Sequence, residues 1–403
     1  MDVMPGYKQS EVGVIPEDWE VAELSSVSSL VTGNTPPTSD KRNYGDQYPF
    51  VSPSDLGEHK WISTSEKRIS ARGRLFSRVV PKSAILFVCI GSTIGKTGIA
   101  AVDLSTNQQI TCATIGDKHC PDFIYYALDF IAPRISFFAG QQAVPIVNKT
   151  EFGKSPIGIP PTKAEQEAIA EALSDADALI ESLEQLIAKK RDIKQATMQE
   201  LLRPKDGWVN KKLGNLGAFL KGSGVRKDEA MSGELPCIRY GEIYTKHSDY
   251  IKGFHSWISK EVAATARRLR AGDLLFAGSG ETSEEIGKCV AFVDDFEAYA
   301  GGDIVILRLE NASAVFMGYY LNTGPINRQK ASKGQGDAVV HIGASALAGI
   351  DITIPGFDEQ TAIATILSDM DAEIAALETK LAKIRRIKQG MMHNLLTGRI
   401  RLV

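Results

Sequence analysis

The 403-residue sequence has few cysteines and histidines, and neither type is arranged as a metal site or a disulfide framework. Its five cysteines are scattered without a C-x-x-C pair, which is typical of a reduced, cytosolic protein. The six histidines lack the spacing of a zinc site. No run of 18 apolar residues is present, and the first residues lack the apolar segment of a secretory signal. We therefore expect a cytoplasmic protein with no metal and no membrane partner.

The common catalytic fingerprints are missing as well. We find no G-x-S-x-G, H-E-x-x-H or G-x-G-x-x-G motif in a suitable context. The catalytic motif of base-modifying methyltransferases is also absent, since residues 35–38 read Thr-Pro-Pro-Thr. Residues 91–97 (GSTIGKT) have three residues between the glycines where a phosphate-binding P-loop needs four, so we interpret them as a turn. The absences together favour a binding protein with no catalytic residues.

One internal repeat organises the chain. Residues 165–202 and 359–396 align without a gap, and the identical pairs include Glu165/Glu359, Gln166/Gln360, Leu173/Leu367, Ser174/Ser368, Asp175/Asp369, Asp177/Asp371, Leu183/Leu377, Arg191/Arg385, Lys194/Lys388 and Leu202/Leu396. Such self-similarity indicates duplication. The preceding parts are only faintly alike, in pairs such as Trp19/Trp208 and Arg78/Arg267. We predict two diverged globular domains, 1–156 and 205–357, each followed by a preserved helical segment, 157–204 and 358–403.

The preserved segments have the pattern of long helices. Apolar residues recur in alternating steps of four and three, as from Ile169 through Leu173 to Ile187, which is a heptad seam. Thr162 and Glu165 are spaced as a capping box, and Pro204 and Gly398 are placed to end the two helices. Because a long amphipathic helix must bury its seam, we expect the two helices to pack against each other as an antiparallel, intramolecular coiled coil. A docking helix or a homodimer helix remains the alternative.

The two diverged domains are predicted to be mixed α/β, or α+β, with mainly short strands. Apolar runs bounded by turn residues predict these strands at 83–88, 98–102, 273–277 and 304–309. Short helical patterns follow at 123–130 and 315–322, and each is followed by a Gly-Gln loop and a last strand. Duplicated domains on an antiparallel helical pair predict a pseudo-two-fold arrangement.

Charge is unevenly distributed in a chain with 46 basic and 49 acidic residues. Seven acids and no base occupy Glu165–Glu184, on the first preserved segment. Seven bases face a single acid, Glu66, in Lys60–Lys82, and five face Glu261 in Lys252–Arg270. Both basic clusters precede an equivalent apolar strand. Lys and Arg bind phosphates and Arg can read guanine, so two such clusters in duplicated domains favour two DNA half-site readers. A solvated face with Arg stems over apolar surface is the alternative.

At this point the layout resembles the specificity (S) subunit of type I restriction–modification systems. The resemblance covers nearly the whole chain, and its carriers are the segments 7–19 (YKQSEVGVIPEDW), Pro160-Pro161 with Glu165-Gln166, Ile354-Pro355 with Glu359-Gln360, and 395–400 (LLTGRI). One departure is Arg203-Pro204-Lys205, where the family often repeats Leu-Thr-Gly.

The resemblance implies a non-catalytic subunit with two target recognition domains, each reading one half of a split sequence in double-stranded DNA. The helices would act as a spacer that fixes the gap and would dock two methyltransferase (modification) subunits, and restriction subunits would then join. S-adenosylmethionine, ATP and Mg²⁺ would be cofactors of those partners, and this chain would hold none.

We select candidate site residues of three kinds. The cationic DNA-contact candidates are Arg68, Arg72, Arg74, Arg78, Lys96, Arg267, Arg268, Arg270 and Lys288. Residues of the Gly-Gln loops are further candidates, since Gln can bind adenine with two hydrogen bonds; they are Gln141, Gln142, Lys333 and Gln335. The partner-facing or capping candidates on the helices are Asp175, Asp177, Asp369 and Asp371.

Two other function classes stay open on the residues alone. One is a coiled-coil scaffold that binds only protein, and the other is a self-contained DNA enzyme with an unrecognised site. DNA binding measured with and without a modification subunit distinguishes the first, and methyl-donor turnover by the chain alone would indicate the second.

Overall fold

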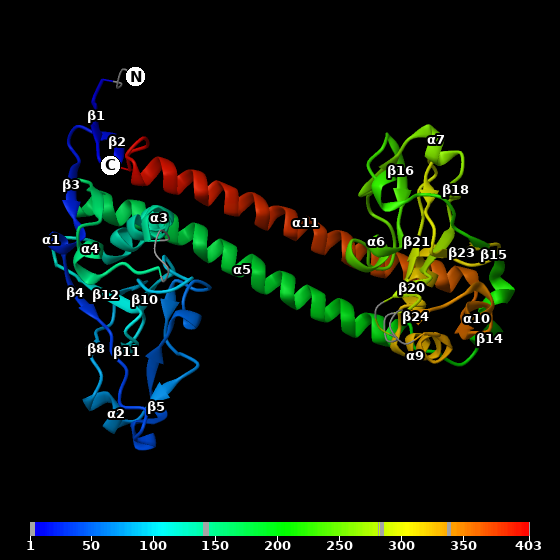
Figure 1. Ribbon diagram of the computed structural model, residues 1–403, viewed down its shortest axis with the longest axis horizontal. Coiled ribbons are helices and arrows are strands. Elements are labelled where there is room, and N and C mark those ends of the chain that lie inside the picture. The colour runs from blue at the N-terminus through cyan, green and yellow to red at the C-terminus, as the bar shows by residue number, and fades with distance from the viewer. Residues whose placement is uncertain (1–4, 140–144, 281, 283–285, 337–339, 403) are drawn as a thin grey trace. The chain divides into compact units, whose positions relative to one another are not determined.

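The computed structural model describes residues 5–139, 145–280, 282, 286–336 and 340–402 of the chain (Figure 1). The chain forms two compact units. Unit 1 consists of Met1–Gln185 and Thr379–Val403, and unit 2 consists of Leu186–Glu378. Unit 1 is therefore assembled from two stretches that are far apart in the sequence, whereas unit 2 is a single stretch.

Two long helices, α5 (Lys163–Leu201) and α11 (Phe357–Leu396), confirm the predicted helical segments. Both segments form helices because their apolar residues recur every three or four positions. In a helix these residues lie on one face, which can be buried. Pro204 follows the end of α5. Beyond α11, Gly398 has φ +66° and its N–H donates to the carbonyl of Leu395, so a left-handed residue that favours glycine terminates this helix.

The two helices run antiparallel in each unit. In unit 1, Lys388 pairs with Asp177 and Arg385 with Glu184, so numbers rise along one helix as they fall along the other. The ion pairs of unit 2 follow the same rule and join Lys190 to Glu373 and Lys194 to Asp371. Most seam residues are buried within the chain and the others are partly buried, which confirms intramolecular packing of the helices and argues against the homodimer alternative.

Unit 1 is built on two mixed sheets. The larger has the order β4-β12-β9-β10-β6 and the smaller β7-β5-β11-β8. Its strands are β1 (Tyr7–Ser10), β2 (Gly13–Pro16), β3 (Glu20–Glu23), β4 (Ser28–Thr32), β5 (Tyr44–Val51), β6 (Trp61–Ile62), β7 (Arg68–Ile69), β8 (Val79–Val80), β9 (Ile85–Val88), β10 (Thr97–Ala100), β11 (Leu104–Thr106), β12 (Ile110–Ile115) and β13 (Pro156–Ile159). Its shorter helices are α1 (Leu24–Val27), η1 (Lys41–Asn43), η2 (Pro53–Asp55), α2 (Ala71–Leu75), α3 (Pro121–Ala139) and α4 (Lys149–Gly153).

Unit 2 is also built on two sheets, the antiparallel β15-β23-β19-β21 and the mixed β17-β16-β22-β18. Its strands are β14 (Val209–Lys212), β15 (Gly217–Lys221), β16 (Leu235–Ile238), β17 (Ser256–Ile258), β18 (Arg267–Arg268), β19 (Asp273–Ala277), β20 (Ser279–Gly280), β21 (Cys289–Ala291), β22 (Tyr299–Ala300), β23 (Ile304–Leu309), β24 (Val340–His341) and β25 (Asp351–Ile354). Its shorter helices are η3 (Leu213–Leu216), η4 (Lys227–Glu229), α6 (Tyr240–Thr245), α7 (Lys260–Ala263), α8 (Ala314–Tyr320), α9 (Gly324–Lys333) and α10 (Ala344–Ala348).

The duplication inferred from the sequence is visible in the strand pairing. In each unit one sheet contains four antiparallel strands in a matching order (β4-β12-β9-β10 and β15-β23-β19-β21), and the other sheet contains one parallel pair, β5 with β11 and β16 with β22. The mixed α/β class and the strands predicted at 83–88, 98–102, 273–277 and 304–309 are confirmed as β9, β10, β19 and β23, with small shifts at their ends.

A tryptophan anchors each core at the same place. Trp19 is fully buried and meets Phe123 of α3 edge to face, with 6.5 Å between ring centroids. Trp208 meets Phe316 of α8 in the same geometry at 6.3 Å. Edge-to-face aromatic pairs add to the stability gained from burial. The faint Trp19/Trp208 match in the sequence therefore corresponds to equivalent packing positions.

The C-terminal end of α11 is tied to the N-terminal hairpin within unit 1 (Figure 1). Tyr7 donates a hydrogen bond to the carbonyl of Gly398, and Arg401 pairs with both Asp18 and Glu165. The predicted capping box is only half present. Thr162 accepts the N–H of Glu165, but the Glu165 side chain binds Arg401 instead of reaching back to the helix end.

No helix among the described residues is long and apolar enough to cross a bilayer. The same part of the chain contains no group of three or more His, Cys, Asp or Glu side chains placed to hold a metal ion.

Candidate nucleic-acid interface

The basic residues of unit 1 gather around the short helix α2. Ser70 caps this helix by accepting the N–H of Gly73 at 3.1 Å. Gly73 lies so close to η1 that a Cβ atom there would be 2.0 Å from the carbonyl oxygen of Asn43. The hydroxyl of Ser70 also donates to the carbonyl of Arg42. The sequence Ser-Ala-Arg-Gly-Arg thus folds into one turn of helix that is fixed directly on the 41–43 segment.

The four arginines predicted in this region differ in how far their guanidinium groups are already hydrogen-bonded within the chain. Arg68 is committed to its own chain, since its guanidinium donates to the carbonyls of Asp46 at 2.7 Å and Gln47 at 3.0 Å. Arg78 is exposed and donates to the carbonyl of Thr32 at 2.6 Å. A guanidinium has five N–H donors, so Arg78 keeps donors that can face solvent.

The remaining two arginines, both on α2, are paired but accessible. Arg72 lies 3.2 Å from Asp40 and remains about half exposed. Arg74 lies over the ring of Tyr48 at 4.4 Å and reaches Asp103 only at 3.8 Å. Arg72, Arg74 and Arg78 therefore form a basic surface at α2, and Lys41 and Arg42, which the sequence reasoning did not select, add to it.

The arginines predicted in unit 2 come together around one hollow. Arg267 and Arg268 from β18 and Arg270 from the following loop are exposed and line a hollow of about 720 Å³. Arg308 also lines it, but its guanidinium is held by Asp273 at 2.8 Å, and this contact raises the pKa of Arg308. Asp295 and Glu297 lie on the same rim, so the surface is basic but not uniformly so.

The predicted lysines, and the one predicted glutamine that the structure describes, lie outside these two basic surfaces. Lys288 is directed inward, where its ammonium group donates to the carbonyls of His247 at 2.6 Å and Tyr244 at 3.3 Å. Gln335 is exposed, and its backbone forms a bridge with His341. Lys333 is half-buried at the end of α9. Gln141 and Gln142 lie outside the described residues.

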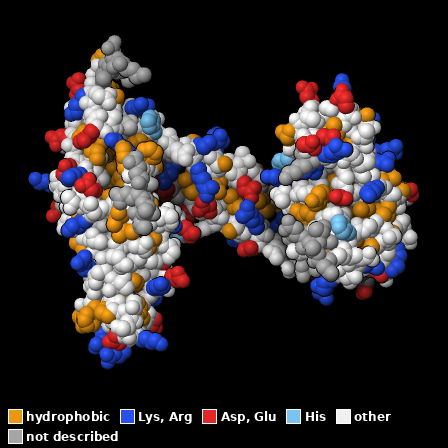
Figure 2. Space-filling model, in the orientation of Figure 1, with side chains coloured by type: hydrophobic (Ala, Val, Ile, Leu, Met, Phe, Trp, Pro, Cys, Tyr) orange, Lys and Arg blue, Asp and Glu red, His pale blue; other side chains and the backbone are white. Residues whose placement is uncertain are grey.

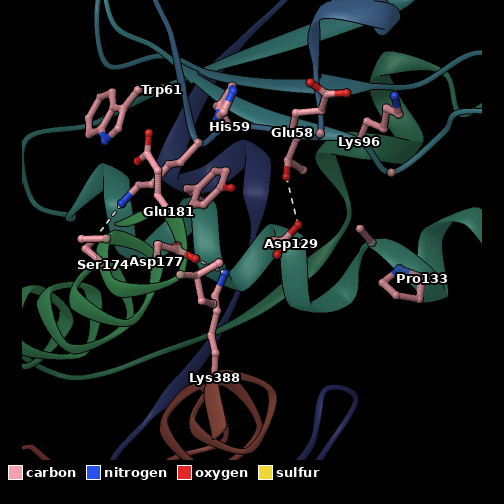
Figure 3. Close-up of a pocket in the computed structure, with 18 of the residues that line it drawn as sticks. Glu58, His59, Trp61, Lys96, Asp129, Pro133, Ser174, Asp177, Glu181 and Lys388 are labelled. Atoms are coloured by element: carbon pink, nitrogen blue, oxygen red, sulfur yellow. Dashed lines mark hydrogen bonds and ion pairs between the residues drawn. The ribbon is translucent and has the colours of Figure 1, made fainter. Parts of the chain in front are cut away.

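Lys96 lines a cleft of about 780 Å³ in unit 1, shown in Figure 3. The cleft lies between the 57–61 loop, α3 and α5, and Lys388 enters it from α11. Asp129 lies in it and accepts the hydroxyl of Thr97, while burial raises the pKa of the Asp129 carboxyl. Glu58 and Glu181 also line the cleft. Because carboxylates are mixed with its cations, the cleft does not match a DNA phosphate backbone.

The four aspartates selected on the long helices fall into two classes. Asp175 and Asp369 are exposed, as a partner-facing role requires. Asp177 and Asp371 are bound within the chain instead, by Tyr126 and Tyr319 respectively. None of the four caps a helix, because all lie well inside α5 or α11, and that part of the prediction is wrong.

The internal networks around Asp177 and Asp371 were not predicted. Lys194 binds Asp371 at 2.8 Å, and Lys388 binds Asp177 at 2.5 Å. Burial opposes ionisation of Asp371, but hydrogen bonds from Lys194 and Tyr319 outweigh it and lower the pKa of this carboxyl. The identity of Lys194 with Lys388 in the repeat was the available signal.

Comparison with known proteins places the chain beside DNA-specificity proteins. The family described as "Type I restriction modification DNA specificity domain" matches residues 16–189 and 205–386. The type I restriction enzyme MjaVIII specificity subunit of Methanocaldococcus jannaschii is 22% identical over 96% of this chain and 94% of its own length. The MjaIX specificity subunit of the same organism is 29% identical, over 44% of this chain and 42% of its own length.

Solved structures share the fold. The S subunit of a type I restriction-modification system from M. genitalium has a TM-score of 0.61 at 16% identity, covering 97% of this chain and 98% of that one. A chain from a study of complex assembly and conformational transition of the type I R-M system has a TM-score of 0.58, also at 16% identity, covering 96% and 99%.

Proposed function

The chain belongs to the type I restriction–modification DNA specificity family and is a specificity subunit with two recognition domains, and on this premise we propose that it reads a two-part DNA target. The recognition domain of unit 1 would read one half-site in double-stranded DNA and that of unit 2 the other. Since its target is DNA, we expect it to act in the cytoplasm.

The observation that carries this proposal is the repetition of one basic surface. In unit 2, Ser259 caps α7 as Ser70 caps α2 in unit 1, in each case by accepting the N–H three residues on. Each of these helices is followed by exposed arginine, Arg78 in unit 1 and Arg267 in unit 2. Phosphate contacts position a protein on DNA and arginine can read guanine, so equivalent surfaces with different neighbours suit two different half-sites.

The long helices supply repeated surfaces for partners. Asp175 and Asp369 are exposed at equivalent positions of α5 and α11, and such a duplicated surface suits two copies of the same methyltransferase subunit. Restriction subunits would join that complex. We assign methyl transfer from S-adenosylmethionine and Mg²⁺-dependent ATP hydrolysis to the partners, and a non-catalytic role to this chain.

The test is to sequence methylated adenines in cells that carry this subunit with its modification subunits. A bipartite motif that disappears when the subunit is deleted is the expected result. A contiguous motif, or methylation that does not depend on the subunit, would contradict the proposal.

Gel shift of the purified chain, with and without modification subunits, separates the two alternatives. Absence of DNA binding in both cases would favour a protein-only scaffold. Methyl-donor turnover by the chain alone would favour a self-contained enzyme.

A further inference from the structure

Two large apolar side chains are exposed at the end of α2. Leu75 is 85% exposed, more than any other large hydrophobic residue that the structure describes, and Phe76 beside it is 49% exposed. Neither belongs to one of the buried clusters of unit 1. Adjacent exposed apolar residues of this size often mark a binding surface.

The support under these side chains is rigid. α2 is fixed to η1 through Ser70 and through the close approach of Gly73 to Asn43, which is itself buried. The backbone of Phe76 is held on both sides, since its N–H donates to the carbonyl of Gly73 and its carbonyl accepts the side chain of Asn34 at 2.7 Å. These contacts therefore hold the backbone that carries Leu75 and Phe76 in a fixed position.

Positive charge surrounds the pair. Figure 2 shows hydrophobic side chains next to Lys and Arg side chains at the end of unit 1 where Figure 1 labels α2. The bases of this surface are Lys41, Arg42, Arg72, Arg74 and Arg78, and the acids that pair with them are Asp40 and Asp103. The guanidinium of Arg72 lies 5.8 Å from the centre of the Phe76 ring. An apolar pair inside a net positive surface matches the base stack of a duplex flanked by its phosphates.

Unit 2 lacks this feature at the equivalent place. The serine caps Ser70 and Ser259, with buried Ile69 and Ile258 before them, align the two helices. Counting on from the caps, the positions of Leu75 and Phe76 are taken in unit 2 by Ala264 and Thr265. Both units keep exposed arginine just beyond, so the apolar pair is an addition in one unit only.

We propose that Leu75 and Phe76 form a wedge that inserts into the base stack of duplex DNA, while the surrounding Lys and Arg side chains hold the flanking phosphates. Inserted Leu and Phe side chains partly unstack a base step and kink the duplex, so the energy of binding comes to depend on how easily that step deforms. The inference rests on the proposed function and deepens it. Unit 1 would read its half-site partly through deformability, whereas unit 2, with Ala264 and Thr265, would not.

The test compares the complex of the full chain with its modification subunits to the same complex carrying Leu75→Ala and Phe76→Thr, which gives unit 1 side chains of the unit 2 kind. Both substitutions are on exposed positions. The matched control is Met231→Ala, which removes a side chain that is 71% exposed in unit 2. Affinity is measured on an intact duplex containing both half-sites, and on a series of duplexes with a single nick at successive steps. A nick leaves every base in place but makes the step easier to open.

The expected result is that the double variant loses about tenfold in affinity for the intact duplex, as for one lost apolar insertion. A nick at one step of one half-site should restore most of this loss, and the control should bind as the unsubstituted complex does. Unchanged affinity, or a loss that no nick restores, would overturn the wedge. A variant that no longer co-purifies with the modification subunits would also overturn it, because the surface would then be a protein contact. Failure of the unsubstituted complex to bind DNA is a separate outcome that would overturn the proposed function.

Discussion

The hydroxyl of Tyr319 donates a hydrogen bond of 2.6 Å to Asp371, and Tyr126 makes the equivalent bond of 2.7 Å to Asp177. In each unit the tyrosine comes from a helix that packs on the sheets, α8 or α3, and the aspartate from a long helix. A lysine from the other long helix binds the same carboxylate. The contact therefore fixes each recognition domain to both long helices of its own unit.

Replacing Tyr319 by Phe should destabilise unit 2 by about 1–2 kcal/mol, since a hydrogen bond to a charged group is lost while the ring packing remains. Tyr126→Phe should have a similar effect on unit 1. Urea unfolding followed by circular dichroism measures both. Tyr240→Phe, at an exposed position, is the control and should leave the midpoint unchanged. Equal midpoints for all three variants would show that the hydroxyl bonds add nothing.

Removing the lysine should cost more in unit 2 than in unit 1. Lys194 and Asp371 are 15% and 14% exposed, whereas Lys388 and Asp177 are 20% and 26% exposed. Lys194 also lies 3.9 Å from Asp249, so its loss weakens two carboxylate contacts, although Asp371 keeps Lys252 at 3.7 Å. We therefore expect Lys194→Met to destabilise the chain by about 2 kcal/mol and Lys388→Met by about 1 kcal/mol. Unfolding midpoints give the comparison, and the reverse order would contradict this account.

The pairing of Arg401 with Glu165 should be essential to unit 1. The Glu165 carboxylate is almost fully buried, and Arg401 also pairs with Asp18 at 3.0 Å. These contacts raise the pKa of Arg401. Arg401→Ala would leave a buried carboxylate unpaired, and we expect a loss of about 3 kcal/mol. Adding Glu165→Gln should recover part of this loss because a neutral amide costs less to bury. Thermal unfolding of the two variants tests the coupling; no recovery would mean that Arg401 acts through packing alone.

The stability of unit 2 should fall as the pH is lowered from about 6.5 toward 4. Burial lowers the pKa of His247 to about 4 from its ordinary 6.5, so in this range the unfolded chain binds a proton that the folded chain does not. The full loss should be about 2–3 kcal/mol. In His247→Leu this component should disappear, whereas in the control His59→Gln, at an exposed position, it should persist. Urea midpoints at pH 7 and pH 5 provide the measurement, and an unchanged pH dependence in His247→Leu would contradict it.

Arg268 should contribute to DNA binding mainly through phosphate. It is exposed in the hollow of unit 2, and its side chain forms no ion pair with another residue that the structure describes. With Arg268→Ala we expect weaker binding of the complex and a salt dependence of log affinity that is less steep by about one ion. Lys154→Ala, an exposed cation on the surface beside Glu151, is the matched control. A salt slope that does not change would remove Arg268 from the interface.

The long helices and the central strands could be predicted because each depends on the spacing of apolar residues that are close together in the sequence. The heptad steps gave both long helices to within a few residues of Lys163–Leu201 and Phe357–Leu396. Short apolar runs between turn residues gave the central strands β9, β19 and β23. These signals depend on neighbours in the sequence, and tertiary contacts did not override them.

The roles of individual cations could not be predicted in the same way. Whether a cation meets solvent or a carbonyl of its own chain depends on loops that are distant in the sequence, as the contacts of Arg68 with Asp46 and of Lys288 with His247 show. The exposure of Leu75 and Phe76 could not be predicted either, because an adjacent apolar pair in a sequence usually indicates a core position. Their exposure is evident only once α2 is placed on η1.

The split composition of unit 1 has a consequence for synthesis on the ribosome. Leu395 and Leu396 belong to the same buried cluster as Trp19 and Phe123, so the core of unit 1 lacks part of its packing until residues 379–403 have been translated. Unit 2 consists of residues 186–378 alone and has all of its own residues earlier. During synthesis the N-terminal part of a chain usually folds first. Here the core of unit 1 can be completed only after the end of α11 has been translated, which is later than the whole of unit 2.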